Sequence, residues 1–221
     1  MKVHDLSMPI ETGHLRWNVD IGKRGSFSDG DLFEVSWLHT TCHGFTHVDA
    51  PRHMVPGGPT LGDLSLDRVV GPASVLDLGS IKPDEAIDAR RLAAAGAHIE
   101  AGEIILFKSC WYQQRDYHTE AFWREAPFLT RDAAEWLLAQ NPTAVAFDFP
   151  QDWTIRCLLD GDVRPIEEHV THDVLLRNNV TLIEYLIGTD KITTPKTFLC
   201  AQPLNLPDAD GAPARVIAVE F

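Results

Sequence analysis

The hydrophobic and polar positions of the chain fall into short apolar runs separated by polar turns. Runs of this length predict strands, because a strand covered on both faces is apolar throughout and one covered on a single face alternates. Strands are therefore predicted over residues 32–39, 68–78, 103–108 and 144–148. Within the second run, Gly71 and Pro72 predict an interruption, because proline lacks the backbone N–H that a sheet ladder uses.

Helical spacing and composition mark a second kind of segment. Residues 84–97 are rich in alanine and other good helix formers, which favours a helix. Residues 130–140 carry apolar residues at helical intervals behind Thr130, a residue type that caps helix N-termini. The other predicted elements are a short helix, an extended segment and the two strands of a closing hairpin, at 172–177, 180–186, 198–204 and 214–219.

The segments between these elements are polar. Residues 12–31 are rich in Gly, Asp, Ser and Arg and are predicted to form a loop, and the Pro-Gly-Gly-Pro run at 56–59 predicts a turn. Because strands alternate with a few helices, the pattern predicts a mixed α/β fold. The chain has 221 residues and no internal repeat, which fits a single domain over residues 1–221.

The charge and the cysteines narrow the choice of partner and compartment. The 19 basic and 32 acidic residues give a formal net charge of −13, which disfavours non-specific binding to nucleic acid or to an anionic membrane. We find no run near the ~20 apolar residues of a membrane span and no signal-peptide run at the start. Four scattered cysteines without a C-x-x-C pair indicate reduced thiols. We therefore expect a cytoplasmic protein.

One segment concentrates the candidate chemistry. Residues 42–54 read Cys-His-Gly-Phe-Thr-His-Val-Asp-Ala-Pro-Arg-His-Met. Imidazole nitrogen and carboxylate oxygen are ligands that zinc and manganese accept. His47 and Asp49 are two residues apart, so both side chains share one face if the segment is extended. The cluster predicts a divalent metal site, to which the neighbouring Cys42 could also contribute.

The cluster resembles the signature H-x-G-T-H-x-D-x-P-x-H of the cyclase family of metal-dependent hydrolases, which includes bacterial kynurenine formamidases and isatin hydrolases. All three histidines, the aspartate and the proline are present. Phe45 stands where the family has glycine, and Gly44 lies one position earlier. The family's C-terminal ligand pair is matched by His172 and Glu184, twelve residues apart (184 − 172). Glu184 lies in Leu-Ile-Glu-Tyr-Leu, which is similar to the family's I-x-E-N-L.

The resemblance implies a fold and a metal centre. The family fold is a swivelling β/β/α domain, usually a homodimer with the active site near the subunit interface. The ligands implied for one or two divalent ions are His43, His47, Asp49, His172 and Glu184. Asp49 would bridge the two ions, and His53 would serve as the acid/base instead of a ligand. His169 competes with His172 as a ligand. Nitrogen and oxygen donors without thiolate suit zinc or manganese.

Four side chains are predicted to contact the substrate: Trp17, Phe45, Gln151 and Arg156. Trp17 lies where family members have a pocket aromatic. Gln151 replaces the serine of the formamidase stretch G-I-D-x-x-S-x-D. Arg156 would suit an acidic or carbonyl-rich ligand, or would form an ordinary ion pair with a nearby aspartate. These departures predict a substrate other than N-formylkynurenine.

The implied activity is hydrolysis of a C–N bond in a small aryl amide or cyclic amide. A metal-bound hydroxide would be the nucleophile, and His53 would protonate the departing nitrogen. A lactone or ester hydrolase, or a ring-closing cyclase, would use the same metal centre. A metal-dependent binding protein without turnover is a third alternative, although such a protein has no need of His53. A homodimer or a higher homo-oligomer is expected.

Overall fold

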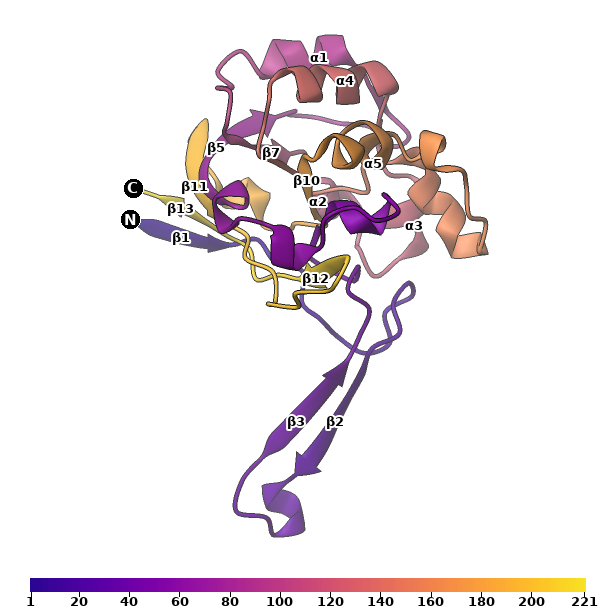
Figure 1. Ribbon diagram of the computed structural model, residues 1–221, viewed down its shortest axis with the longest axis vertical. Coiled ribbons are helices and arrows are strands. Elements are labelled where there is room, and N and C mark those ends of the chain that lie inside the picture. Colours follow the sequence, from indigo (N-terminus) through magenta and orange to yellow (C-terminus); the bar gives the residue numbers. More distant parts are fainter.

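The computed structural model describes residues 1–221 and is built around a nine-stranded mixed sheet (Figure 1). Its strand order is β1-β13-β11-β5-β7-β9-β10-β4-β12. The strands are β1 (Lys2–Asp5), β4 (His47–Asp49), β5 (Val70–Asp77), β7 (Ile104–Lys108), β9 (Ala144–Ala146), β10 (Thr181–Glu184), β11 (Lys196–Cys200), β12 (Gly211–Pro213) and β13 (Ile217–Glu220). The central neighbours β5, β7, β9 and β10 run parallel, and the pairs toward both edges are antiparallel. The predicted mixed α/β fold is confirmed.

The central strands are buried on both faces. On β7, Ile105 and Phe107 pack into one apolar layer, while Ile104 and Leu106 pack into the other. This division follows from the strand geometry, because successive side chains point to opposite faces. It also explains the continuous apolar runs of the sequence, since neither face of these strands meets water.

Short helices close the first of these layers. They are α1 (Ala89–Ala95), α2 (Trp111–Gln114), α3 (Glu120–Arg124), α4 (Arg131–Ala139) and α5 (Val170–Val174). Helices α1 and α4 lie side by side over the sheet, and α4 also contacts α5 (Figure 1). None of the helices combines the length and the apolarity needed to cross a lipid bilayer.

A two-stranded hairpin projects from the body of the molecule (Figure 1). It consists of β2 (Asp20–Gly25) and β3 (Val35–His39), which pair antiparallel, and we call residues 20–39 the arm. The prediction of a loop over residues 12–31 was therefore wrong for β2. The sequence of β2 is Asp-Ile-Gly-Lys-Arg-Gly, which has no apolar run, so only its pairing with β3 makes it a strand.

Two other predicted elements have different bounds. Strand β5 is continuous through Gly71 and Pro72, because pairing with β7 begins only at Ala73, so Pro72 needs no N–H for that ladder. The helix expected over 84–97 starts only at Ala89. Asp88 is its N-cap residue, and the Asp88 side chain accepts a hydrogen bond from the Arg91 amide. The residues before it form β6 (Ala86–Ile87), which pairs with β8 (Phe128–Leu129).

Candidate metal centre

Strand β4 carries two candidate ligands, His47 and Asp49, into the interior. It lies between β10 and β12, with His47 directly opposite Glu184 and Asp49 opposite Gly211. His47, Asp49 and Glu184 are all buried. Gly211 has to be small, because a Cβ at this position would lie 2.6 Å from Cε1 of His43. The strand register therefore gathers an imidazole and two carboxylates into one buried patch.

Asp49 is the centre of this patch. Its Oδ1 atom lies 2.7 Å from Nδ1 of His43 and 3.2 Å from Nε2 of His47. Its Oδ2 atom lies 3.6 Å from Nε2 of His172, and it is buried without a hydrogen-bond partner. Buried polar atoms are nearly always paired, and an unpaired buried charge is costly. The free oxygen therefore fits a bound cation.

The tautomers of two histidines also fit a cation. Nδ1 of His47 donates to the Phe45 carbonyl at 2.8 Å, and Nδ1 of His172 lies 2.7 Å from Oδ2 of Asp152. These bonds turn the Nε2 atoms toward Glu184, at 3.7 Å for His47 and 3.4 Å for His172. An imidazole whose outer nitrogen donates to a carbonyl or carboxylate is the usual arrangement around protein-bound metals.

Protons balance the carboxylate charges in this cluster. Burial lowers the pKa of His43, but hydrogen bonds to Asp49 and Asp210 outweigh it and raise the pKa to about 9. Burial likewise opposes charge on His172, yet Asp152 and Asp49 hold its pKa well above the ordinary value. Burial would raise the pKa of Asp49, but the neighbouring imidazoles keep it well below its usual range. A divalent ion would take over the positive charge that these protons carry.

His53 lies beside the cluster. Its ring stacks on that of His43 with centroids 3.8 Å apart. Burial, with the positive charges of His43 and His172, lowers the pKa of His53 to about 4 despite the attraction of Asp49. His53 is therefore neutral near pH 7. Its ligand nitrogen also lies close enough to a ring nitrogen of His43 and a carboxylate oxygen of Asp49 for the three to share an ion, so a ligand role competes with the acid/base role.

A second possible grouping lies behind the first. The ligand atoms of Asp152, His169 and His172 lie close enough together to hold an ion. However, Nδ1 of His169 is 2.9 Å from the Thr154 hydroxyl, and Asp152 already accepts from His172 and from the Thr171 amide. These contacts make Asp152 a support that orients His172.

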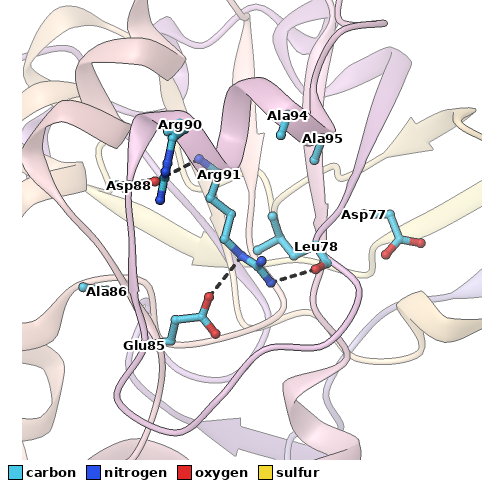
Figure 2. Close-up of a pocket in the computed structure, with 9 residues that line it drawn as sticks. All are labelled: Asp77, Leu78, Glu85, Ala86, Asp88, Arg90, Arg91, Ala94 and Ala95. Carbon is cyan, nitrogen blue, oxygen red and sulfur yellow. Dashed lines mark hydrogen bonds and ion pairs between the residues drawn. The ribbon is translucent and has the colours of Figure 1, made fainter.

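A cavity of about 390 Å³ opens onto the histidines. Its wall combines imidazoles and Glu184 with apolar and cationic side chains, which are Arg16, Met54, Ile155, Leu158, Val163, Arg164, Ile166 and Tyr185. A larger hollow of about 740 Å³ lies beside α1 (Figure 2). Figure 2 shows its Arg91 paired with Glu85 and bonded to the Leu78 carbonyl. No histidine lines that hollow, so the smaller cavity is the better substrate site.

The four side chains predicted to contact the substrate do not line this cavity. Trp17 and Phe45 are buried and pack against each other, with ring centroids 4.6 Å apart. The Gln151 amide donates to Glu184 and to Thr171, so it holds a candidate ligand in place. Arg156 pairs with Asp84 and donates to the Ala126 carbonyl. Arg16 and Arg164, which the sequence analysis passed over, are the arginines at the cavity. Arg16 could have been noticed only as the neighbour of Trp17.

Two departures from the family signature share a backbone feature. Phe45 and Tyr185 replace glycine and asparagine, and both are in the left-handed region, with φ of 56° and 58°. Glycine and asparagine enter this region at low cost, whereas bulky residues are strained there. The Thr46 hydroxyl donates to the Tyr185 carbonyl at 2.7 Å, which stabilises the turn. The turns are therefore retained, and each now carries an aromatic ring.

Comparison with known proteins agrees with this geometry. The family model described as "Putative cyclase" matches residues 4–151, which is more than half of the chain. The chain belongs to the cyclase family. Its candidate metal ligands lie on the family's signature and on the later His172–Glu184 pair.

Curated members of the family match almost the whole chain. A kynurenine formamidase of Bacillus cereus is 27% identical over 227 residues, which cover 96% of this chain and 95% of that protein. An isatin hydrolase of Roseibium aggregatum is 27% identical over 237 residues, covering 97% and 86%. The crystal structure of an isatin hydrolase bound to the product analogue thioisatinate superposes with a TM-score of 0.82 at 24% identity, covering 98% and 91%. The fold is therefore that of the cyclase family, and the relatives are hydrolases.

Proposed function

We propose that the chain is a metal-dependent hydrolase of a C–N bond in a small aryl amide or cyclic amide. The observation that carries this proposal is the unpaired, buried Oδ2 of Asp49 among the imidazoles that line a cavity of about 390 Å³. Such a carboxylate oxygen fits a cation, and the cavity gives a small substrate access to it.

The proposed ligands for one or two ions are His43, His47, Asp49, His172 and Glu184. Zinc and manganese are the candidate metals, since the donors are nitrogen and oxygen alone. A bound divalent ion would supply Lewis acidity, which lowers the pKa of water and polarises a carbonyl. Gln151 and Asp152 would keep Glu184 and His172 in position through the hydrogen bonds they make.

His53 is the proposed proton carrier. A neutral imidazole can accept a proton from the attacking water and then donate it to the departing nitrogen. Water thus adds across the C–N bond and gives a carboxylic acid and an amine. The apolar wall at Ile155, Leu158 and Ile166 would hold an aryl ring and exclude bulk water from the reacting bond.

The same groups would also serve a lactone or ester hydrolase or a ring-closing cyclase, because a polarised carbonyl and a proton carrier suffice for each. Assays with formanilide, N-formylkynurenine, isatin and an aryl lactone separate these activities. Faster turnover of the formamides or isatin supports the proposal, and turnover of the lactone alone supports the alternative. A protein that binds metal yet turns over none of them would be a binding protein.

The role of His53 is tested by His53→Ala. We expect turnover to fall by about 10²–10⁴-fold while metal content, measured by mass spectrometry, stays at the wild-type level. His118→Ala is the matched control, because His118 is exposed and pairs with Asp116 and Glu11 outside the cavity. Loss of metal from His53→Ala would make His53 a ligand instead.

We further propose a homodimer in which a second copy covers the arm. The arm exposes Ile21, Val35, Trp37 and Leu38 by 40–48% of their surface, and an isolated two-stranded hairpin is marginal in water. Light scattering should give twice the chain mass, and Trp37→Lys with Leu38→Lys should give the single-chain mass. A monomeric wild type would refute this.

We also make proposals about the domain organisation and the cellular compartment. We propose that residues 1–221 form a single domain, so thermal unfolding should show one transition by both tryptophan fluorescence and circular dichroism. We also propose a cytoplasmic location, because all four cysteines are free thiols, as is usual in a reducing compartment.

A further inference from the structure

Arg16 lines the cavity beside the metal centre and has no carboxylate partner. None of the ion pairs of the structure includes it, and Glu11, the acidic residue of the loop that carries Arg16, pairs with His118. The backbone N–H of Arg16 donates to Nδ1 of His14 at 3.2 Å, which fixes the loop that carries it. An unpaired cation thus faces the space in which the substrate would bind.

An aromatic surface holds this guanidinium. Its Cζ atom lies 4.3 Å from the ring centroid of Trp123, 5.2 Å from that of Trp17 and 5.6 Å from that of Tyr185. Contacts of this kind use the flat face of the guanidinium and stabilise its charge. Its N–H groups lie around the edge, and the one side-chain hydrogen bond there is the 3.4 Å contact with the Tyr185 hydroxyl. The remaining edge is available to a ligand.

The other arginines near the cavity are already paired. Arg164 is 3.0 Å from Glu168 and 3.5 Å from Asp162, and Arg156 pairs with Asp84. Arg16 therefore differs from both in having donors to offer. It also lies close to the metal centre, because the ring of Tyr185, which it contacts, is 5.4 Å from the ring of His47.

We propose that Arg16 binds an anionic group of the substrate, so that the enzyme prefers an aryl or cyclic amide that carries a carboxylate away from the scissile bond. This deepens the function proposed above and rests on it. The carboxylate would meet the guanidinium edge in charge-assisted hydrogen bonds, while the amide carbonyl lies toward the histidines that line the same cavity.

The test compares one neutral formamide with three that carry a carboxylate on the ring. Metal-loaded protein is assayed with formanilide and with the ortho, meta and para formamidobenzoates. We expect the wild type to prefer at least one formamidobenzoate by about tenfold or more in kcat/KM. Arg16→Gln should abolish the preference through a higher KM for the formamidobenzoates, with a much smaller change in kcat/KM for formanilide. Arg16→Lys should keep part of it, because lysine retains the charge and loses the planar fork.

Arg90→Gln is the control, because Arg90 is exposed on α1 and lines the separate hollow beside that helix instead of the cavity at the metal centre. A wild type without the preference, or Arg16→Gln with the preference intact, overturns the proposal. So does an equal loss on formanilide, which would indicate a structural role. If the wild type hydrolyses neither a formamide nor isatin, the proposed function fails. In that case, or if only isatin is hydrolysed, benzoate binding decides on Arg16. Its dissociation constant, from tryptophan fluorescence, should rise about tenfold in Arg16→Gln only; an unchanged value refutes the proposal.

Discussion

Near each end of the nine-stranded sheet a buried carboxylate lies beside a histidine, but the two carboxylates differ in how completely they are hydrogen-bonded. On β13, Oε2 of Glu220 is 2.8 Å from Nε2 of His4. Its Oε1 accepts from both the amides and the hydroxyls of Thr193 and Thr194. On β4, Asp49 has imidazoles around it and one buried oxygen that nothing bonds.

This difference separates a structural carboxylate from a candidate functional one. The protein's own donors saturate Glu220, and the His4 and threonine bonds lower its pKa to about 2. Such a carboxylate stabilises the fold and has no capacity left for a ligand. The fold instead leaves Asp49 incompletely paired, which is costly in the absence of a cation and favourable in its presence.

The largest expected effect is that of Asp49→Asn. The amide removes the charge that would attract an ion and places N–H groups among the imidazoles. We expect loss of bound metal and a fall in hydrolysis on the order of 10³-fold or more. Mass spectrometry of the purified variant and a circular dichroism spectrum measure metal content and folding. A folded variant with wild-type metal content would remove Asp49 from the ligand set.

The stability gained from the metal should depend on Asp49 and not on Glu220. An ion at 100 times its dissociation constant adds about 2.7 kcal/mol to the folded state, and about 2–4 °C of Tm corresponds to each kcal/mol in a chain of this size. Chelation should therefore lower the Tm of the wild type and of Glu220→Gln equally. Asp49→Asn should show no such shift. An equal shift in all three proteins would place the ion elsewhere.

The smallest effect is that of Glu220→Gln. The folded pKa of Glu220, about 2, lies below the ordinary value of 4.5. Its stabilisation is therefore fully present above pH 4.5 and is lost as the pH falls toward 2. We expect the variant to melt about 2–4 °C below the wild type at pH 7 and the gap to close between pH 4.5 and 2. Metal content should not change. A gap that persists at pH 2 would contradict this explanation.

Much of the fold could be predicted because burial leaves a pattern along the chain. The runs at 103–108 and 144–148 became β7 and β9, and Thr130 precedes α4. Strand β2 could not be predicted, because it has a single large apolar residue, Ile21, among Asp, Gly, Lys and Arg and its conformation depends on β3. Nor could the continuity of β5 at Pro72, because only the position at which β7 begins to pair makes the missing N–H harmless.

The candidate site shows the same division. Ligand types in residues 43–53 indicated a metal site. The resemblance to the cyclase family added the His172–Glu184 pair, and the structure brings these residues together around Asp49. Arg156 was nominated by its place after Gln151, yet it turns toward Asp84. Arg16 was not nominated, because its contacts with Trp123 and Tyr185, which are distant in sequence, are what distinguish it from other loop arginines.

The sequence by itself determined the mixed α/β class through its hydrophobic period and the cyclase-family membership through its signature residues, and the resemblance to that family then implied the set of candidate ligands. Only the tertiary structure decided which oxygen of Asp49 is left without a donor, which arginine is left without a partner, and that Phe45 and Tyr185 occupy left-handed turns. Each of these depends on groups distant in sequence that meet across strands and loops, and pairing between such groups leaves no periodic trace along the chain.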